Sequence, residues 1–206
     1  MQPNLEDLTR IDASLIPQAS EVLTRAFWND PFDLYFFPDE SSRRKCLPAF
    51  FEYRLKQGLR YGEVYATSPS LEGIAVWTDP TRVKSSFWRE LFTGGFKLYR
   101  MYGGTIIKEM RQFEAFAMER HAKYARPPYM HLGPLGVNPQ HQGKGHASRL
   151  IKPMLRRLDG EGVSCYLETQ NKDNVSLYEH LGFEVVAEGV APFLDIPHWD
   201  MIHMPP

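Results

Sequence analysis

In the first third of the chain, apolar residues recur at helical spacing in two segments, and short β-rich segments follow. Helices are predicted over Ala13–Phe27 and Ser41–Gly58. Pro48 conflicts with the second helix and predicts a kink there. Segments rich in Val, Tyr, Ile and Trp at Glu63–Thr67 and Leu71–Thr78 predict a β-hairpin.

Turn residues separate these elements. Asn29-Asp30-Pro31 ends the first helix, because proline cannot continue the helical hydrogen-bond ladder and Asp and Asn favour turns. Two aromatic-rich helices are predicted next, over Ser86–Tyr102 and Thr105–Tyr124, with Gly103-Gly104 between them. Their aromatic residues exceed the needs of one small sheet, so core packing, a ligand pocket and a dimer contact all stay open.

The last third of the chain alternates between strands and helices. Strands are predicted over Tyr129–Val137, Val163–Gln170, Phe183–Glu188 and His198–Met204, and helices over Gly143–Gly160 and Asn174–Leu181. This order implies crossover connections, so we expect an α/β fold. The expected architecture is a central mixed sheet of about six or seven strands with helices on both faces, in one domain spanning residues 1–206.

Composition excludes several classes of protein. With 206 residues, 43% of them hydrophobic, the chain suits a single domain. Its 24 basic and 25 acidic residues give a net charge of −1, so we expect no nucleic-acid partner. It has two cysteines, an acidic N-terminus and no apolar run near the roughly 20 residues of a membrane span. We therefore expect a cytoplasmic location and no membrane partner.

A glycine-rich turn stands between the predicted strand Tyr129–Val137 and the helix after it. Glycines such as Gly143 and Gly145 let backbone N–H groups face outward, and the start of the helix adds free N–H donors. Together they predict a phosphate or pyrophosphate site. The P-loop pattern does not fit, and Ser148 stands where the dinucleotide fingerprint requires its third glycine.

Two motifs resemble the GNAT superfamily of acetyl-CoA-dependent N-acetyltransferases. Gln142-x-x-Gly145-x-Ala147 matches the superfamily's phosphate turn, and Asn174, Tyr178 and Gly182-Phe183 resemble its second element. The pattern is most similar to the puromycin N-acetyltransferase-like branch. That likeness rests on Ala75-Val76-Trp77-Thr78, Gln140-His141-Gln142-Gly143-Lys144-Gly145, Leu167-Glu168-Thr169, Tyr178 to Phe183, and Trp199 with Met201.

The resemblance implies the GNAT fold, acetyl-CoA as cosubstrate, an acetyl-CoA-binding half at 129–206 and a more divergent acceptor-side half at 1–128. The turn's amides would hold the coenzyme's pyrophosphate, and Asn174 would touch its pantetheine arm. The coenzyme-binding residues implied are Leu135, Gly136, Val137, Gln142, Gly143, Lys144, Gly145, His146, Ala147, Ser148, Asn174 and Tyr178.

Direct transfer of acetyl from a thioester to an amine needs a neutral amine, a stabilised oxyanion and a proton for the leaving thiolate. Pro134 and Pro139 cannot donate to a strand ladder, so they favour a splay or bulge that frees backbone amides between them. By resemblance, the amide of Leu135 is the oxyanion donor. Tyr178 is the expected general acid, because a phenol held beside a thiolate can protonate it. Packing on the core face of its helix is the alternative role for Tyr178.

Three residues compete for the general base, and four are expected to line the acceptor site. Glu168 is the first choice because it lies near a strand end, with Asp30 and His131 in reserve. As alternatives, Glu168 is an ordinary exposed or salt-bridged glutamate, Asp30 is a helix-stop turn residue, and His131 faces solvent or a helix. Trp77 ends a strand and either walls the acceptor pocket with these three residues or packs in the core.

The acceptor and the assembly stay open. A primary amine of a small molecule or of a peptide is the expected acceptor, and a non-catalytic acyl-CoA-binding sensor on the same fold is the alternative function. An enclosed aromatic pocket would favour a small amine and an open groove a peptide. We expect no metal, because His198 and His203 lie far in sequence from any acidic or Cys cluster. Both a monomer and a homodimer are compatible with the sequence.

Overall fold

The computed structural model describes residues 4–82, 95–125, 127–191 and 194–206. Phe87, Trp88 and Phe92, which belong to the first predicted aromatic helix, lie outside these residues. Within the described part of the chain, no helix is long and apolar enough to span a membrane.

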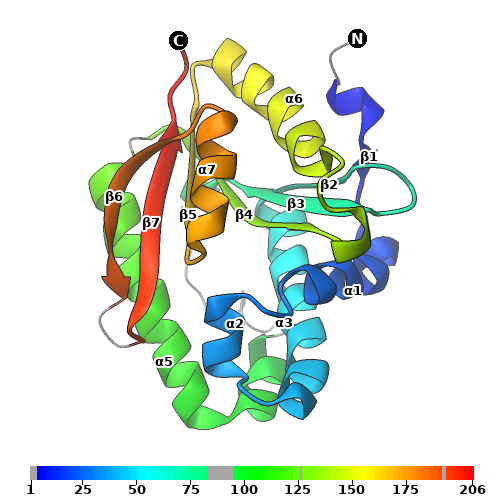
Figure 1. Ribbon diagram of the computed structural model, residues 1–206, viewed down its shortest axis with the longest axis vertical. Helices are drawn as coiled ribbons and strands as arrows, with labels where there is room; N and C mark the ends of the chain where they lie inside the picture. Colours follow the sequence, from blue (N-terminus) through cyan, green and yellow to red (C-terminus); the bar gives the residue numbers. More distant parts are fainter. Residues whose placement is uncertain (1–3, 83–94, 126, 192–193) are drawn as a thin grey trace.

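Seven strands form one mixed sheet in the order β1-β2-β3-β4-β5-β7-β6 (Figure 1). The strands are β1 (Thr9–Arg10), β2 (Gly62–Ala66), β3 (Gly73–Thr78), β4 (Tyr129–Val137), β5 (Ser164–Thr169), β6 (Glu184–Ala191) and β7 (Ile196–His203). The β4–β5 pair is parallel and the other neighbouring pairs in the described sheet are antiparallel. The predicted mixed sheet is therefore confirmed.

Helices cover both faces of the sheet, as expected. They are α1 (Ile16–Ala26), α2 (Pro31–Phe36), α3 (Glu40–Tyr61), α5 (Gly95–Tyr124), α6 (His146–Glu161) and α7 (Lys172–His180). One core joins α1 and α3 to Ile74 and Val76, and the other joins α6 and α7 to Ala75 and Trp77. Because successive strand residues point to opposite faces, β3 contributes to both cores.

One predicted helix boundary in the first part was wrong, and one short helix was not predicted. The second helix does not end at Gly58 but continues through Pro48 to Tyr61. Gly58 is a packing glycine, since a Cβ placed on it would lie 2.5 Å from Val76 Cγ1 and 2.8 Å from Val64 Cγ2. The segment after the first helix also forms α2, with Pro31 at its start, where proline is well tolerated.

The break at Gly103-Gly104 is confirmed. α5 extends over Gly95–Tyr124, but Gly103 interrupts it with a φ of 79° and a ψ of 166°. A Cβ there would meet nothing within 4 Å, so glycine is required by the positive φ and not by crowding. The element is thus two helical segments joined at the predicted glycine pair.

Strands β4 and β5 pair at one end and separate toward the other. Their parallel pairing runs from Tyr129 opposite Ser164 to His131 opposite Tyr166. Beyond His131, β4 pairs with β3 alone, and its register shifts there, with Leu132 opposite Trp77 and Leu135 opposite Ala75. The predicted splay and bulge are therefore both present. They leave the β5-facing edge of β4 without a strand partner in the described sheet.

Candidate active site

One cleft of about 370 Å³ takes its lining from β4 beyond His131 and from the end of β5. This volume lies in the range of small-molecule sites, roughly 300–1,000 Å³. Most of the lining is apolar or aromatic. Its aromatic members are Phe27, Phe32, Phe50, Phe51, Tyr53, Tyr61, Tyr99, Phe113 and Tyr178. The aromatic helices thus divide their roles, because Tyr99 and Phe113 line the cleft while Tyr102 is buried in the core.

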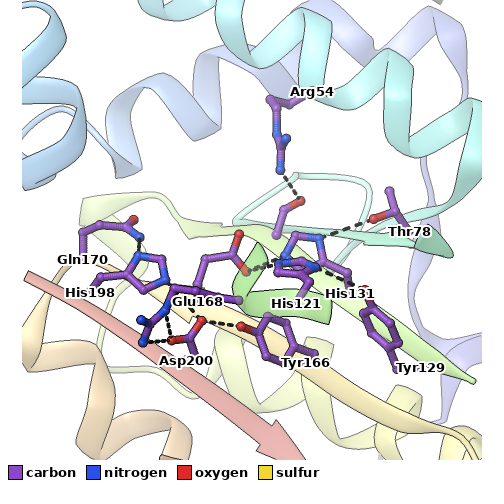
Figure 2. Close-up of polar contacts among 12 residues, drawn as sticks. Arg54, Thr78, His121, Tyr129, His131, Tyr166, Glu168, Gln170, His198 and Asp200 are labelled. Atoms are coloured by element: carbon purple, nitrogen blue, oxygen red, sulfur yellow. Dashed lines mark hydrogen bonds and ion pairs between the residues drawn. The ribbon is translucent and has the colours of Figure 1, made fainter. Parts of the chain in front are cut away.

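Glu168 lines this cleft, and one of its carboxylate oxygens contacts two adjacent imidazoles (Figure 2). Its Oε2 is 2.8 Å from His131 Nε2 and 3.2 Å from His121 Nε2. The other ring nitrogens face hydroxyls, with His131 Nδ1 3.5 Å from Thr78 Oγ1 and His121 Nδ1 3.3 Å from the Tyr129 hydroxyl. Three elements, α5, β4 and β5, therefore converge on one carboxylate.

Burial and charge set the protonation of this group. Burial alone would raise the pKa of Glu168, but the adjacent His131 and His121 hold it well below its usual range. Burial lowers the pKa of His131, and the neighbouring Glu168 does not fully restore it. Near neutral pH the carboxylate is therefore ionised and His131 is neutral. The hydrogen-bond network then assigns an Nε2–H that donates to Glu168 and an Nδ1 that accepts from Thr78.

A second buried network supports these residues from β7. Asp200 is fully buried and accepts hydrogen bonds from Arg120, Tyr166 and His198 (Figure 2). The ring of Tyr166 packs edge-on against His121, with their centroids 4.4 Å apart. The network therefore limits the positions available to His121 and, through it, to Glu168.

Tyr178 reaches the same cleft from α7. Its side chain is 8% exposed, and its hydroxyl has no hydrogen-bond partner among the described residues. Burial, followed by the charge of Asp30, raises the pKa of Tyr178 above its ordinary value. The phenol is therefore protonated near neutral pH, as a proton donor must be.

Asp30 lies at the cleft, but it also has a structural task. Its Oδ1 accepts the backbone N–H of Phe32 at 3.0 Å and caps α2. Asp33, one turn later, is 2% exposed and also lines the cleft. The Oδ1 of Asp33 is buried without a hydrogen-bond partner in the described structure. Burial raises the pKa of both carboxyls, and the charge of Asp30 adds to the shift at Asp33.

The prediction that Trp77 walls the acceptor pocket is wrong, and its alternative, packing in the core, is confirmed. The side chain of Trp77 is fully buried in the core that includes α6, and it does not belong to the cleft lining. Its neighbours Val76 and Thr78 line the cleft instead. The alternation of side chains along β3 explains the error, because a residue between two cleft-facing residues must face the other side.

The glycine-rich turn has the backbone geometry expected of an anion site. Gly143 and Gly145 have φ values of +74° and +80°, and a Cβ on either would meet nothing within 4 Å. Gly145 precedes the first residue of α6, so no side chain caps the N–H groups that begin this helix. Open backbone donors at a helix start suit a phosphate or pyrophosphate, so these residues fit the coenzyme's phosphates.

The other predicted coenzyme residues surround this turn. Gln142 donates from Nε2 to the carbonyl of Val137 at 3.3 Å, and Lys144 donates from Nζ to the carbonyl of Gln140 at 3.2 Å. Both side chains thus brace the turn itself. The first turn of α6 contains His146, Ala147 and Ser148, each partly buried.

The bulged part of β4 and the start of α7 supply the remaining predicted contacts. Leu135 and Asn174 line the cleft, and Asn174 Nδ2 lies 3.5 Å from Thr169 Oγ1. Gly136 is buried, and a Cβ there would lie 2.8 Å from Leu23 Cδ2 and 2.9 Å from Ala26 Cβ. This glycine therefore allows α1 to pack closely on β4. Leu135, Asn174, Tyr178 and Glu168 consequently share one cleft.

Sequence reasoning missed several members of the site. His121, Asp33 and Arg54 line the cleft, and Arg54 donates to the carbonyl of Gly133 at 3.2 Å. His121 lies in the last turn of a long helix, where nothing in the sequence distinguishes it from a surface histidine. The grouping of three potential metal-ligand side chains, His121, His131 and Glu168, was also unforeseen.

Two comparisons with known protein sequences show what the chain is similar to. The model of the acetyltransferase (GNAT) family matches residues 98–183. An uncharacterized N-acetyltransferase of Schizosaccharomyces pombe is 28% identical over 180 residues, which are 84% of this chain and 72% of that protein.

Solved structures share the fold. One from Corynebacterium glutamicum, described as a histone acetyltransferase and related acetyltransferase, is 22% identical and covers 100% of this chain and 98% of its own, with a TM-score of 0.68. The arylalkylamine N-acetyltransferase 2 of Aedes aegypti is 12% identical and covers 97% and 98%, with a TM-score of 0.66. The chain therefore has the GNAT fold and is an acyltransferase enzyme that is similar, over residues 98–183, to the acetyltransferase (GNAT) family.

Proposed function

We propose that this enzyme transfers the acetyl group of acetyl-CoA directly to the primary amine of a small amphipathic molecule. One observation carries the proposal: Leu135, Asn174 and Tyr178, expected on the coenzyme side, line the same cleft as Glu168 and His131, expected on the acceptor side. A thioester and an amine bound by these two groups would therefore meet within one apolar enclosure. Such an enclosure strengthens every electrostatic contact in it.

On the acceptor side, Glu168 is the general base. Its Oε2 is occupied by two imidazole N–H groups, whereas Oε1 has no partner among the described residues. The ionised carboxylate attracts an ammonium group and accepts its proton through Oε1, directly or through one water. The amine's N–H protons become more acidic as its bond to the carbonyl carbon forms. A carboxylate of low pKa therefore suffices at that stage.

On the donor side, Leu135 and Tyr178 act on the thioester. The amide of Leu135, on the bulged part of β4, donates to the thioester oxygen as negative charge develops there. Tyr178 then gives its proton to the departing thiolate and is restored from solvent. The raised pKa of this phenol keeps it protonated near neutral pH, so a proton is available when the thiolate departs.

The coenzyme's phosphates would rest on the turn at Gln142 to Ala147. The open backbone at Gly143 and Gly145 supports this assignment, with the free N–H groups of α6 behind it. Acetyl-CoA supplies an acetyl group activated as a thioester. Lys144 adds a positive charge at the edge of the turn, and Asn174 binds the pantetheine arm.

The lining of the cleft favours a small acceptor with an apolar or aromatic body over a peptide. Phe32 and Phe113, with ring centroids 4.8 Å apart, form part of the aromatic lining of the cleft that also contains Glu168. Asp33 adds a buried carboxyl whose Oδ1 lacks a partner in the described structure, so it suits a second polar group on the acceptor. Mosquito arylalkylamine N-acetyltransferases share the fold, but the inference about the acceptor rests on this lining.

Finer assignments belong to the same proposal. The motifs Ala75-Val76-Trp77-Thr78 and Leu167-Glu168-Thr169 support the puromycin N-acetyltransferase-like branch, without implying puromycin as the acceptor, because acceptor specificity belongs to the divergent half. We keep a cytoplasmic location and a monomer or homodimer as predictions.

A screen of amines tests the function. Purified protein is mixed with acetyl-CoA and a panel of arylalkylamines, polyamines, puromycin and peptides with free N-termini, and free thiol and acetylated product are both measured. We expect acetylation of at least one compact aromatic amine, with peptides poorer by tenfold or more. Thiol release with peptides alone would contradict the acceptor class, and no release with any amine would contradict the function.

A further inference from the structure

The cluster of His121, His131 and Glu168 has the composition and spacing of a transition-metal site. Their potential ligand atoms all lie within 4.8 Å of one another. We propose that these three side chains bind one divalent transition-metal ion of the zinc type, and that the bound ion blocks the general base. The binding claim rests on the cluster alone, and the claim about blocking rests on the proposed function.

The distances within the cluster suit a common metal. Zinc binds imidazole nitrogen at about 2.0–2.1 Å and carboxylate oxygen at about 2.0–2.2 Å, so neighbouring ligands lie about 3.3 Å apart around a tetrahedral ion. Glu168 Oε2 is 2.8 Å from His131 Nε2 and 3.2 Å from His121 Nε2. Both distances are close to the spacing of neighbouring ligands around one ion, and no pair of ligand atoms in the cluster is more than 4.8 Å apart.

The hydroxyls behind the imidazoles allow the required change of tautomer. Metal binding needs a free lone pair on each Nε2, so each proton must move to Nδ1 through solvent. Thr78 Oγ1 faces Nδ1 of His131, and the Tyr129 hydroxyl faces Nδ1 of His121. A hydroxyl can accept as well as donate, so both rings stay neutral and both remain hydrogen-bonded. Partners of this kind are typical behind metal-bound histidines.

The three ligands come from α5, β4 and β5, so the fold holds them together. Figure 2 shows the Glu168 carboxylate beside the two adjacent rings, with one oxygen directed toward them. All three residues line the cleft, which leaves at least one coordination position for water. Two imidazoles and a carboxylate are a donor set used by zinc and by ferrous iron. Arg54, bonded to the carbonyl of Gly133, adds a nearby positive charge that limits affinity.

Direct titration of the metal-free protein with zinc chloride tests the binding claim. Calorimetry is expected to show one ion per chain with micromolar affinity, weakened at least tenfold by His131→Ala and by Glu168→Gln. His180→Ala is the matched control, because His180 is exposed on α7 away from the cluster, and its affinity should equal that of the unaltered chain. Unchanged affinity in Glu168→Gln, or loss in His180→Ala, would overturn the site.

X-ray absorption at the zinc edge on the unaltered protein avoids any folding defect of the variants. Two imidazoles in the coordination shell are expected, and one or none would overturn the site. Acetyl transfer is followed separately, where zinc should inhibit in competition with the amine and not with acetyl-CoA. Zinc that binds without slowing transfer would remove the role of Glu168 as base and leave the site intact. If zinc does not bind while transfer still depends on Glu168, the metal site is overturned and the role of Glu168 as base remains.

Discussion

Replacing Glu168 by glutamine removes the charge of the general base and keeps the size of its side chain. The amide oxygen can still accept from His121 and His131, which lie 3.2 and 2.8 Å from Oε2 in the unaltered protein. The amide NH₂ then takes the position of Oε1, where it cannot accept a proton. The variant therefore tests proton acceptance with little change in packing.

The expected loss follows from the chemistry of the site. General-base catalysis is typically worth about 10²–10⁴-fold, which corresponds to roughly 2.7–5.4 kcal/mol of transition-state stabilisation. We expect kcat/KM for the amine to fall by this factor and the KM for acetyl-CoA to stay within about twofold, because the hydrogen-bond partners of Glu168 are His121 and His131 and neither belongs to the phosphate turn. Two charge-assisted hydrogen bonds also become neutral, so the free energy of unfolding should fall by about 1–3 kcal/mol.

Steady-state thiol release measures the rates, and urea denaturation measures the stability. Glu188→Gln is the matched control, because it makes the same chemical change on an exposed residue of β6. Its rates and stability should equal those of the unaltered enzyme. If Glu168→Gln keeps more than a tenth of the original kcat/KM at a saturating coenzyme concentration, Glu168 is not the base.

Four further changes test the rest of the site. Tyr178→Phe should lower kcat about 10²–10⁴-fold with little change in either KM, and a loss confined to KM would show a packing role. Gln142→Ala combined with Gly145→Asp should raise the Kd for coenzyme A at least tenfold by calorimetry, and an unchanged Kd would show that the phosphate turn is misassigned. Burial lowers the pKa of His131, so below about pH 6.5 the unfolded chain binds a proton that the folded state excludes. The free energy of unfolding in urea should therefore fall as the pH drops below about 6.5, and a flat profile from there to pH 5 would contradict this. Trp77→Phe should lower the free energy of unfolding by about 1–3 kcal/mol and leave the KM for the amine unchanged, since a raised KM would restore Trp77 to the acceptor wall.

The coenzyme half was predictable because its signals are local. Strand periodicity over Tyr129–Val137 gave correct bounds for β4, and Pro134 indicated the interrupted edge that the register shift confirms. The glycines at 143 and 145 have the positive φ values that such a turn needs. In each case, the residue type reports the local backbone conformation, so no knowledge of distant contacts was required.

The acceptor half depended on contacts that a single sequence does not encode locally. Gly58 looked like a helix end, but its lack of a side chain serves the packing of α3 on Val76. Trp77 looked like a pocket residue until the pleat of β3 determined which way it faced. His121 approaches Glu168 from 47 positions away in the chain, and only the packing of α5 against the sheet brings them together.

Simultaneous measurement of thiol and acetylated amine in one reaction tests the central claim most directly. With acetyl-CoA and a compact aromatic amine, we predict equal amounts of both products. Glu168→Gln and Tyr178→Phe, tested separately, should each lower the rate at least about a hundredfold, because acid–base catalysis is typically worth about 10²-fold or more. Tight coenzyme binding with neither product, or full activity in both variants, would contradict direct acetyl transfer by these residues.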